Sequence, residues 1–302
     1  MNSAARTQLF PHRPRCTVAG VAIDCVTMDE AAAEVVSRLK QRQAGAIPFL
    51  IMGPNAQLIN LAQRNRDFAE ALQASALNVP DGISMVLAAK LFGRNISDRV
   101  PGGELMERLC RDASERGLSV YLLGGLPGAA EGAAKELQRR YPSLSVAGAD
   151  CPPLGFEHDA IECSRIQQRI VAAAPDLLFV ALGAPKQEVW MHKNCRSLPI
   201  GAAMSVGAAF DTLAGLRKRA PLWTQKIGME WFYRLVQEPG RLWKRYLIGN
   251  ISFLYLVLEQ FLIFGRRAPE QGSVFADDVS SCGLSSYLLS EVGDIREAGL
   301  KY

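Results

Sequence analysis

Short apolar runs alternate with helix-type segments along most of this chain, and this alternation most constrains its fold. Each apolar run ends in a turn rich in Gly, Pro, Asn or Asp, and an amphipathic pattern follows it. Because strands that alternate with helices are usually parallel neighbours in one sheet, the pattern predicts an α/β protein with a mostly parallel, doubly wound sheet. The expected strands are 17–26, 47–52, 76–80, 118–123, 144–148, 177–182 and 200–206.

Polar side chains occupy three of the turns in the first third of the chain. Asn55 follows the run that ends at Met52, Asp81 follows Pro80, and Arg99 lies in a Pro/Gly turn before another expected helix. In a parallel sheet, turns after strands lie at the carboxyl ends, where ligands usually bind. The sequence therefore predicts a polar site, although Asn and Asp before helices are commonly only N-caps, and spacing alone gives both interpretations comparable weight.

Composition and missing motifs exclude several classes of function. A chain of 302 residues with 49% apolar and 21% charged residues is typical of a globular protein with a sizeable core. Seven scattered cysteines without C-x-x-C predict reduced thiols, and no signal-peptide core is evident near the N-terminus. The three histidines are far apart, and neither D-x-D nor G-x-S-x-G occurs. We therefore expect no metal site, no cofactor and no hydrolase elbow.

The C-terminal part differs in charge from the rest. Residues 217–267 contain ten Lys/Arg against three acids, among many aromatic residues, whereas residues 268–302 are acidic. Within the basic part, the apolar run 247–264 is near the lower length limit for a bilayer span, but polar residues interrupt it. This pattern favours an amphipathic helix lying on a membrane surface over a span or a nucleic-acid site. A helix packed on the domain core is the alternative.

The expected organisation has four parts. Residues 1–15 form a disordered arm, residues 16–215 the α/β domain, residues 216–267 a basic, aromatic appendage, and residues 268–302 a flexible acidic tail. Two further features stay open. The glycine-rich turn at 124–128 is either a phosphate cradle or a tight strand-to-helix turn. Asp211 belongs either to the site or to a helix N-cap.

Seven motifs in order, between about Val18 and Tyr246, carry a resemblance to a known family. They are PNAQLI, PDGISMV, RVPGGEL, YLLGGLPG, LGAPKQE, GAAFDTLAG and RAPLW-x₄-GMEWFYRLVQEP. Together they resemble the bacterial WecG/TagA/CpsF glycosyltransferases (family 26). The resemblance implies a Rossmann-like α/β fold with helices on both faces of the sheet and a C-terminal helical, membrane-associating appendage. It also implies an inverting, metal-independent transfer of sugar from a UDP-sugar to a polyprenyl-diphosphate-linked saccharide, at the inner face of the cytoplasmic membrane.

The resemblance also assigns roles to individual residues. Asp81 matches the proposed catalytic base, and Asn55 matches the Asn of a T-x-N motif whose Thr position is Gly53 here. Glu104 stands where relatives usually have Asp. The remaining matches are substrate-binding candidates: Arg99, Lys186, Gln187 and the appendage arginines Arg219, Arg234 and Arg241. For Gln187 and Glu188, helix capping is the alternative.

The sequence leaves the substrate open. The donor sugar is expected to be glucose, N-acetylmannosamine or its uronic acid, used in envelope-glycan or exopolysaccharide synthesis. The alternatives are a soluble nucleotide-sugar transferase and a membrane-associated adaptor with a degenerate site. No nucleic-acid partner is expected, and a homo-oligomer stays open.

Overall fold

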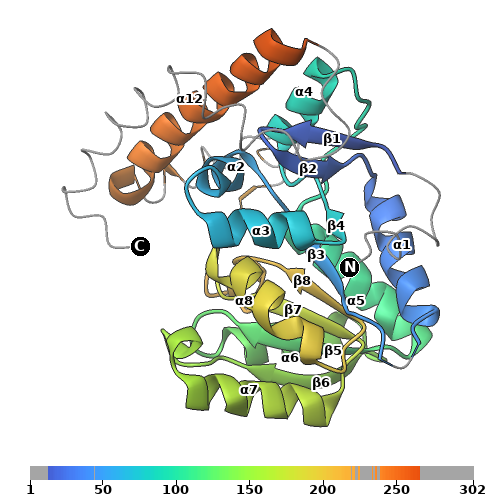
Figure 1. The fold of residues 1–302 in the computed structure, drawn as a ribbon. Helices are drawn as coiled ribbons and strands as arrows, with labels where there is room; N and C mark the ends of the chain where they lie inside the picture. The colour runs from blue at the N-terminus through green and yellow to red at the C-terminus, as the bar shows by residue number, and fades with distance from the viewer. Residues whose placement is uncertain are drawn as a thin grey trace.

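Six parallel strands form the central sheet in the order β4-β3-β8-β7-β5-β6 (Figure 1). The predicted α/β fold with a parallel sheet is therefore confirmed. Each strand overlaps an apolar run expected to be a strand. Their bounds are β3 Phe49–Met52, β4 Leu77–Asn78, β5 Ser119–Gly124, β6 Ser145–Asp150, β7 Leu177–Ala181 and β8 Ala202–Ser205.

The computed structural model describes residues 13–43, 45–218 and 239–265, together with 220, 221, 224, 233, 235 and 236. For 239, 241, 242 and 244–247 it describes the backbone alone. Most of the arm expected at 1–15 and the whole tail expected at 268–302 lie outside these residues. The arm's last residues are placed, however, because Arg13 pairs with Asp24 and Glu34, and the first strand begins at Arg15.

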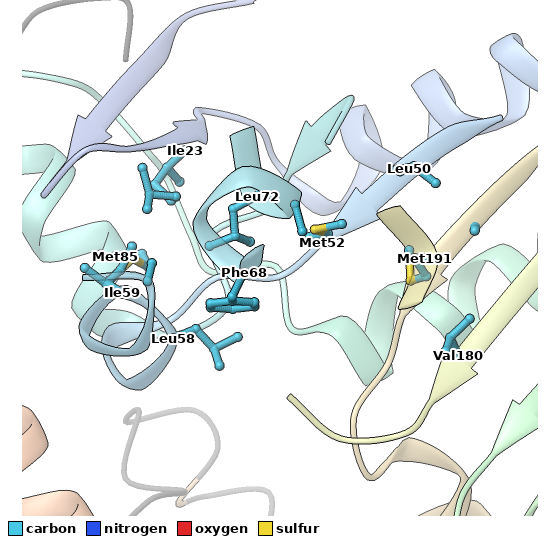
Figure 2. Close-up of a cluster of buried hydrophobic side chains, with 14 of the residues drawn as sticks. Ile23, Leu50, Met52, Leu58, Ile59, Phe68, Leu72, Met85, Val180 and Met191 are labelled. Atoms are coloured by element: carbon cyan, nitrogen blue, oxygen red, sulfur yellow. The ribbon is translucent and has the colours of Figure 1, made fainter. Parts of the chain in front are cut away.

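Helices cover both faces of the sheet. The strands contribute side chains to both layers, because successive strand residues point to opposite sides of a sheet. Phe49 and Ile51 join one apolar cluster, whereas Leu50 and Met52 join the other. The first cluster contains α1 Met28–Lys40, α5 Gly102–Arg116, α6 Ala129–Arg140 and α9 Ala209–Leu213. The second contains α2 Ala56–Ala62, α3 Arg66–Ala74, α4 Ile83–Leu91, α7 Ala160–Ala173 and α8 Lys186–Asn194, with short 3₁₀ turns at η2 Phe156–His158 and η3 Cys195–Ser197 (Figure 2).

The expected strand 17–26 is instead a hairpin of two short antiparallel strands, β1 Arg15–Val18 and β2 Val21–Asp24. Ala19 and Gly20 connect them, and both have positive φ. A two-residue turn of this kind matches the twist of paired strands, and it is usually formed by Asn-Gly or Asp-Gly. Because alanine rarely adopts positive φ, Ala-Gly is not a typical hairpin signal and the turn was not predicted.

The C-terminal helix α12, Pro239–Phe264, packs on α2 and on this hairpin (Figure 1). Phe253 and Val257 enter the apolar cluster, and Asn60 of α2 donates a hydrogen bond to the carbonyl of Gly249. Gln260 is fully buried; it donates to the carbonyl of Thr17 and accepts from the amide of Ala19, each at 2.7 Å. The alternative of a helix packed on the domain is therefore correct for this face of α12.

The other face of α12 is apolar and exposed. Its solvent-facing residues Ile251, Leu254, Leu258 and Leu262 recur at helical spacing. The polar positions that interrupt the apolar run do not form a solvated face, since Gln260 is buried and Gly249 faces Gln57 of α2. The helix is thus amphipathic, with an apolar face exposed to solvent and some of its polar residues in contact with the domain. Within the described part of the chain, no helix combines the length and hydropathy that crossing a membrane requires.

Gln260→Ala tests the attachment of α12. The change leaves a buried amide of Ala19 and a buried carbonyl of Thr17 without their partner, so we expect the free energy of unfolding to fall by about 2 to 4 kcal/mol. Chemical denaturation measures this loss. Glu259→Ala, the half-exposed neighbour on the same helix, is the matched control and should change stability much less. Equal effects of the two changes would contradict this anchoring role.

Candidate active site

A cavity of about 530 Å³ opens where the carboxyl ends of β3, β4, β7 and β8 meet. Its wall includes Gly53 and Asn55 after β3, Asp81 after β4, and Gln187 beyond β7, together with the turn at 205–209 after β8. The position agrees with the rule that ligands bind outside the carboxyl ends of strands in open α/β sheets. Polar side chains that are far apart in sequence are thus brought to one cavity.

Asp81 is held in place by the backbone around it. Its amide donates to the carbonyl of Pro54, and the carbonyl of Pro80 accepts from the amide of Val100, so the turn joins the loops after β3 and before α5. A Cβ at Gly53 would lie 3.2 Å from the Cβ of Asp81. The backbone conformation of Gly53 does not require glycine, because its φ is not positive. The absence of a side chain at this position therefore leaves room beside the Asp81 carboxylate. Asp81 is half-buried and lines the cavity.

Asn55 is both a cap and a residue of the cavity wall. Its Oδ1 accepts from the amides of Gln57 and Leu58, which makes it the N-cap of α2. This fixes the carboxamide so that Nδ2 is the group left to donate to a ligand. The two interpretations of this residue therefore hold together.

Arg99 lies beside the start of α5. Its side chain is 14% exposed, and its guanidinium nitrogen Nη2 lies 3.8 Å from Oε1 of Glu104. Residues 102–104 also line the cavity, and α5 begins there without a side-chain cap. A guanidinium next to the N-terminal end of a 15-residue helix gives this wall a positive potential suited to an anion.

Gln187 and Glu188 lie in the first turn of α8, whose N-cap Pro185 makes no side-chain hydrogen bond. Gln187 Oε1 accepts from the amide of Gly207 at 3.2 Å, and its Nε2 donates to Glu188 Oε1 at 2.7 Å. Glu188 is 1% exposed, and burial raises the pKa of its carboxyl above the usual value. The neighbouring Gln187 amide and Ser205 hydroxyl act in the opposite direction and lower this pKa. Both glutamine and glutamate line the cavity.

The other predicted site residues are not among the described residues of the cavity wall. Lys186 is absent from the cavity wall, and its Nζ lies 2.6 Å from Oε1 of Glu157. Arg219 and Arg234 fall outside the described residues, and only the backbone of Arg241, in α12, is described. The structure therefore brings Asn55, Asp81, Arg99 and Gln187 together; the roles of all these residues stay predictions.

Several wall residues were not predicted from the sequence. Lys218, Asn250 and Phe253 reach the cavity from the C-terminal part of the chain, and Ser205 lines it at the end of β8. Asn250 gave a signal, because it interrupts an apolar run. Lys218 directly precedes the RAPLW motif. Ser205 ends a buried strand and gave none.

The glycine-rich turn at 124–128 is a tight strand-to-helix turn outside the cavity wall. A Cβ at Gly124 would meet the carbonyl oxygen of Ala181 at 2.6 Å, so this glycine is required by close packing. The amide of Leu126 donates to Asp211, whose carboxylate also lies 3.3 Å from Arg217. Asp211 is the third residue of α9, so it is neither an N-cap nor a wall residue. Its contacts are structural.

Within the described parts of the chain, no three His, Cys, Asp or Glu side chains lie close enough together to hold a metal ion. The basic side chains on the described part of the wall are those of Arg99 and Lys218. The described wall thus combines carboxyl groups (Asp81, Glu104, Glu107 and Glu188) with carboxamides and basic groups, a set that can accept a proton and bind an anion.

Comparisons with known proteins identify the family. The model of the glycosyl transferase WecG/TagA/CpsF family matches residues 16–267. An N-acetylglucosaminyldiphosphoundecaprenol N-acetyl-beta-D-mannosaminyltransferase from Bacillus subtilis (strain 168) is 31% identical over 67% of this chain and 76% of its own. The protein of the same name from Staphylococcus aureus (strain MW2) is 29% identical over 80% of this chain and 91% of its own. The chain therefore belongs to the WecG/TagA/CpsF family and is a glycosyltransferase.

Proposed function

We propose that this enzyme transfers a hexose-type sugar from a UDP-sugar to a polyprenyl-diphosphate-linked saccharide, with inversion and without a metal ion. The observation that carries the proposal is the position of Asp81 in one cavity with Asn55, Arg99 and Gln187. The names of both relatives specify a polyprenyl-diphosphate-linked N-acetylglucosamine acceptor and a transferred N-acetylmannosamine. N-Acetylmannosamine is therefore the first donor sugar to test, before its uronic acid and glucose.

In the proposed reaction, Asp81 accepts the proton of an acceptor hydroxyl. The oxygen attacks the anomeric carbon from the side opposite UDP, and the bond to the diphosphate oxygen breaks as the new glycosidic bond forms. The electron pair of the broken bond leaves on UDP. A single displacement of this kind inverts the anomeric centre, and a carboxylate is an appropriate general base.

The leaving diphosphate needs positive charge near it. Arg99 and the N-terminal end of α5 supply it from the cavity wall, and Lys218 adds a cation from the C-terminal side. We propose that Arg219, Arg234 and Arg241 complete this set. Asn55, through Nδ2, and Gln187 would hold sugar or nucleotide groups by hydrogen bonds, because their other amide atoms are already engaged.

The proposed location is the inner face of the cytoplasmic membrane. The exposed residues Ile251, Leu254, Leu258 and Leu262 form an apolar stripe on α12, within a segment rich in basic residues. Such a combination binds anionic lipid surfaces. Since Asn250 and Phe253 of the same helix line the cavity, a helix lying on the membrane would bring the lipid-linked acceptor beside Asp81.

A panel of UDP-sugars with a short-chain polyprenyl-diphosphate-N-acetylglucosamine acceptor tests the function. UDP release and the product mass identify the donor. Transfer with a water-soluble acceptor that persists in a folded variant lacking residues after 218 would favour the soluble alternative. Absence of UDP release with every donor would favour the adaptor.

Asp81→Asn should lower kcat by at least about 100-fold, because it removes the general base while preserving the size of the side chain. UDP affinity, measured by calorimetry, should be nearly unchanged. Turnover at the wild-type rate would remove Asp81 as the base.

Activity should persist after EDTA treatment, since the proposed mechanism uses side-chain cations on the diphosphate. Initial rates before and after chelation measure this. Loss of turnover that returns on adding Mg²⁺ or Mn²⁺ would contradict metal independence.

Leu254→Ser with Leu258→Ser should weaken binding to anionic vesicles by at least about tenfold, because two side chains no longer enter the apolar layer of the membrane. Vesicle co-sedimentation measures it. Leu154→Ser with Ile161→Ser, which changes exposed apolar residues away from α12, is the matched control. Equal binding by both double variants would place the membrane contact elsewhere.

A further inference from the structure

We propose that Glu188 is a positioning residue that acts as a neutral carboxylic acid and fixes the amide of Gln187 on the cavity wall. The proposal deepens the one above, because it rests on Gln187 binding the substrate. It concerns a group that lies behind the wall residue, where the cavity meets the buried start of α8.

The hydrogen bonds define the orientation of the Gln187 amide. A backbone amide such as that of Gly207 can only donate, so the side-chain atom facing it is the carbonyl oxygen Oε1. The NH₂ group then faces Glu188, with 2.7 Å between Gln187 Nε2 and Glu188 Oε1. One N–H of Gln187 remains for a ligand. Without an acceptor at position 188, the NH₂ group loses its fixed partner and the amide is free to rotate.

The surroundings of Glu188 favour the neutral acid. The side chain is 1% exposed, and strands β3, β7 and β8, against which α8 packs, carry no charged residue. On α3, the charged side chains form the exposed pairs Arg66–Glu70 and Asp67–Lys193. A buried carboxylate without a cationic partner is costly, so burial raises the pKa of this group.

Among the remaining titratable groups near α8, His192 lies one turn beyond Glu188 on the same helix and is half-buried, and Arg196 of η3 is exposed. Lys186 pairs with Glu157, while Asp81, Arg99 and Glu104 line other parts of the wall. The second oxygen of Glu188, Oε2, is buried and has no hydrogen-bond partner among the described residues. An unpaired buried charge on this carboxyl costs more than an unpaired buried O–H group, so the missing partner favours the neutral acid.

A neutral Glu188 makes stability depend on pH in a defined direction. Its pKa in the folded protein lies above the ordinary 4.5, so the unfolded chain loses this proton first as pH rises. The folded state then binds more protons than the unfolded state, and stability falls with rising pH through that window. Glu188→Gln keeps the acceptor and a donor but cannot ionise.

The first experiment therefore needs no substrate. We expect the unfolding free energy of Glu188→Gln, relative to wild type, to increase steadily from about pH 4.5 upward. Denaturation over a pH series measures it, with the exposed Glu70→Gln as control, for which no such trend is expected. A pH-independent difference between Glu188→Gln and wild type would show an ordinary carboxylate and overturn the proposal.

The second experiment compares Glu188→Gln with Glu188→Leu in turnover. Glu188→Gln should rescue kcat/KM to near the wild-type value and should lose the alkaline fall in activity that ionisation of Glu188 causes in the wild type. Glu188→Leu, which removes the acceptor, should lower kcat/KM at least about tenfold. A folded Glu188→Leu with wild-type kinetics, or a folded Glu188→Gln as impaired as the leucine variant, would overturn the proposal.

The two experiments separate this inference from the proposed function. If wild-type enzyme releases UDP from no donor, the function fails while the stability series still decides the state of Glu188. If Glu188→Leu does not fold, the pH dependence of the unfolding free energy of Glu188→Gln, compared with that of wild type, still decides whether Glu188 is neutral.

Discussion

The parallel direction of all six strands is the constraint on which the site depends. Parallel strands place their carboxyl ends at one edge, and the insertion of β8 between β3 and β7 brings turns from opposite ends of the chain to one cavity. Asp81 comes from the turn after β4, and Gln187 comes from the helix after β7. The backbone contacts of the turn at 80–82 then fix the carboxylate beside Gly53.

Buried polar groups connect this wall to the rest of the molecule. Gln260 attaches α12 to the hairpin β1–β2, and Asn60 attaches it to α2, whose N-cap is Asn55. The helix that presents an apolar stripe outward therefore also contributes to the cavity. On the wall formed after β7, Glu188 accepts a hydrogen bond from Gln187. In both places, a side chain with few alternative partners fixes the geometry, because an unsatisfied buried group is costly.

The sheet was predictable because strands β3, β4, β5, β7 and β8 are buried almost throughout and read as short apolar runs, whereas the edge strand β6 is more exposed. The turns carrying Asn55, Asp81 and Arg99 were predictable for the same reason, since each follows or adjoins such an element. The hairpin was missed because Ala19 adopts a conformation that alanine rarely takes. The sequence pattern did not predict that polar residues of α12 face the protein. Helical periodicity shows which residues share one side of a helix, but not whether that side faces the domain or the solvent. The burial of Glu188 could not be predicted from the sequence. An acidic residue in the first turn of a helix usually interacts with the helix dipole at the surface, and Glu188 follows Gln187 in such a turn.

The most direct test of this account is a crystal structure with UDP and a short-chain acceptor analogue bound. The account predicts the diphosphate at the N-terminal end of α5 beside Arg99, and an acceptor hydroxyl within about 2.6 to 3.2 Å of an Asp81 carboxylate oxygen. It also predicts one N–H of Gln187 in contact with a ligand. A nucleotide bound at the glycine-rich turn 124–128, or an acceptor hydroxyl far from Asp81, would contradict it.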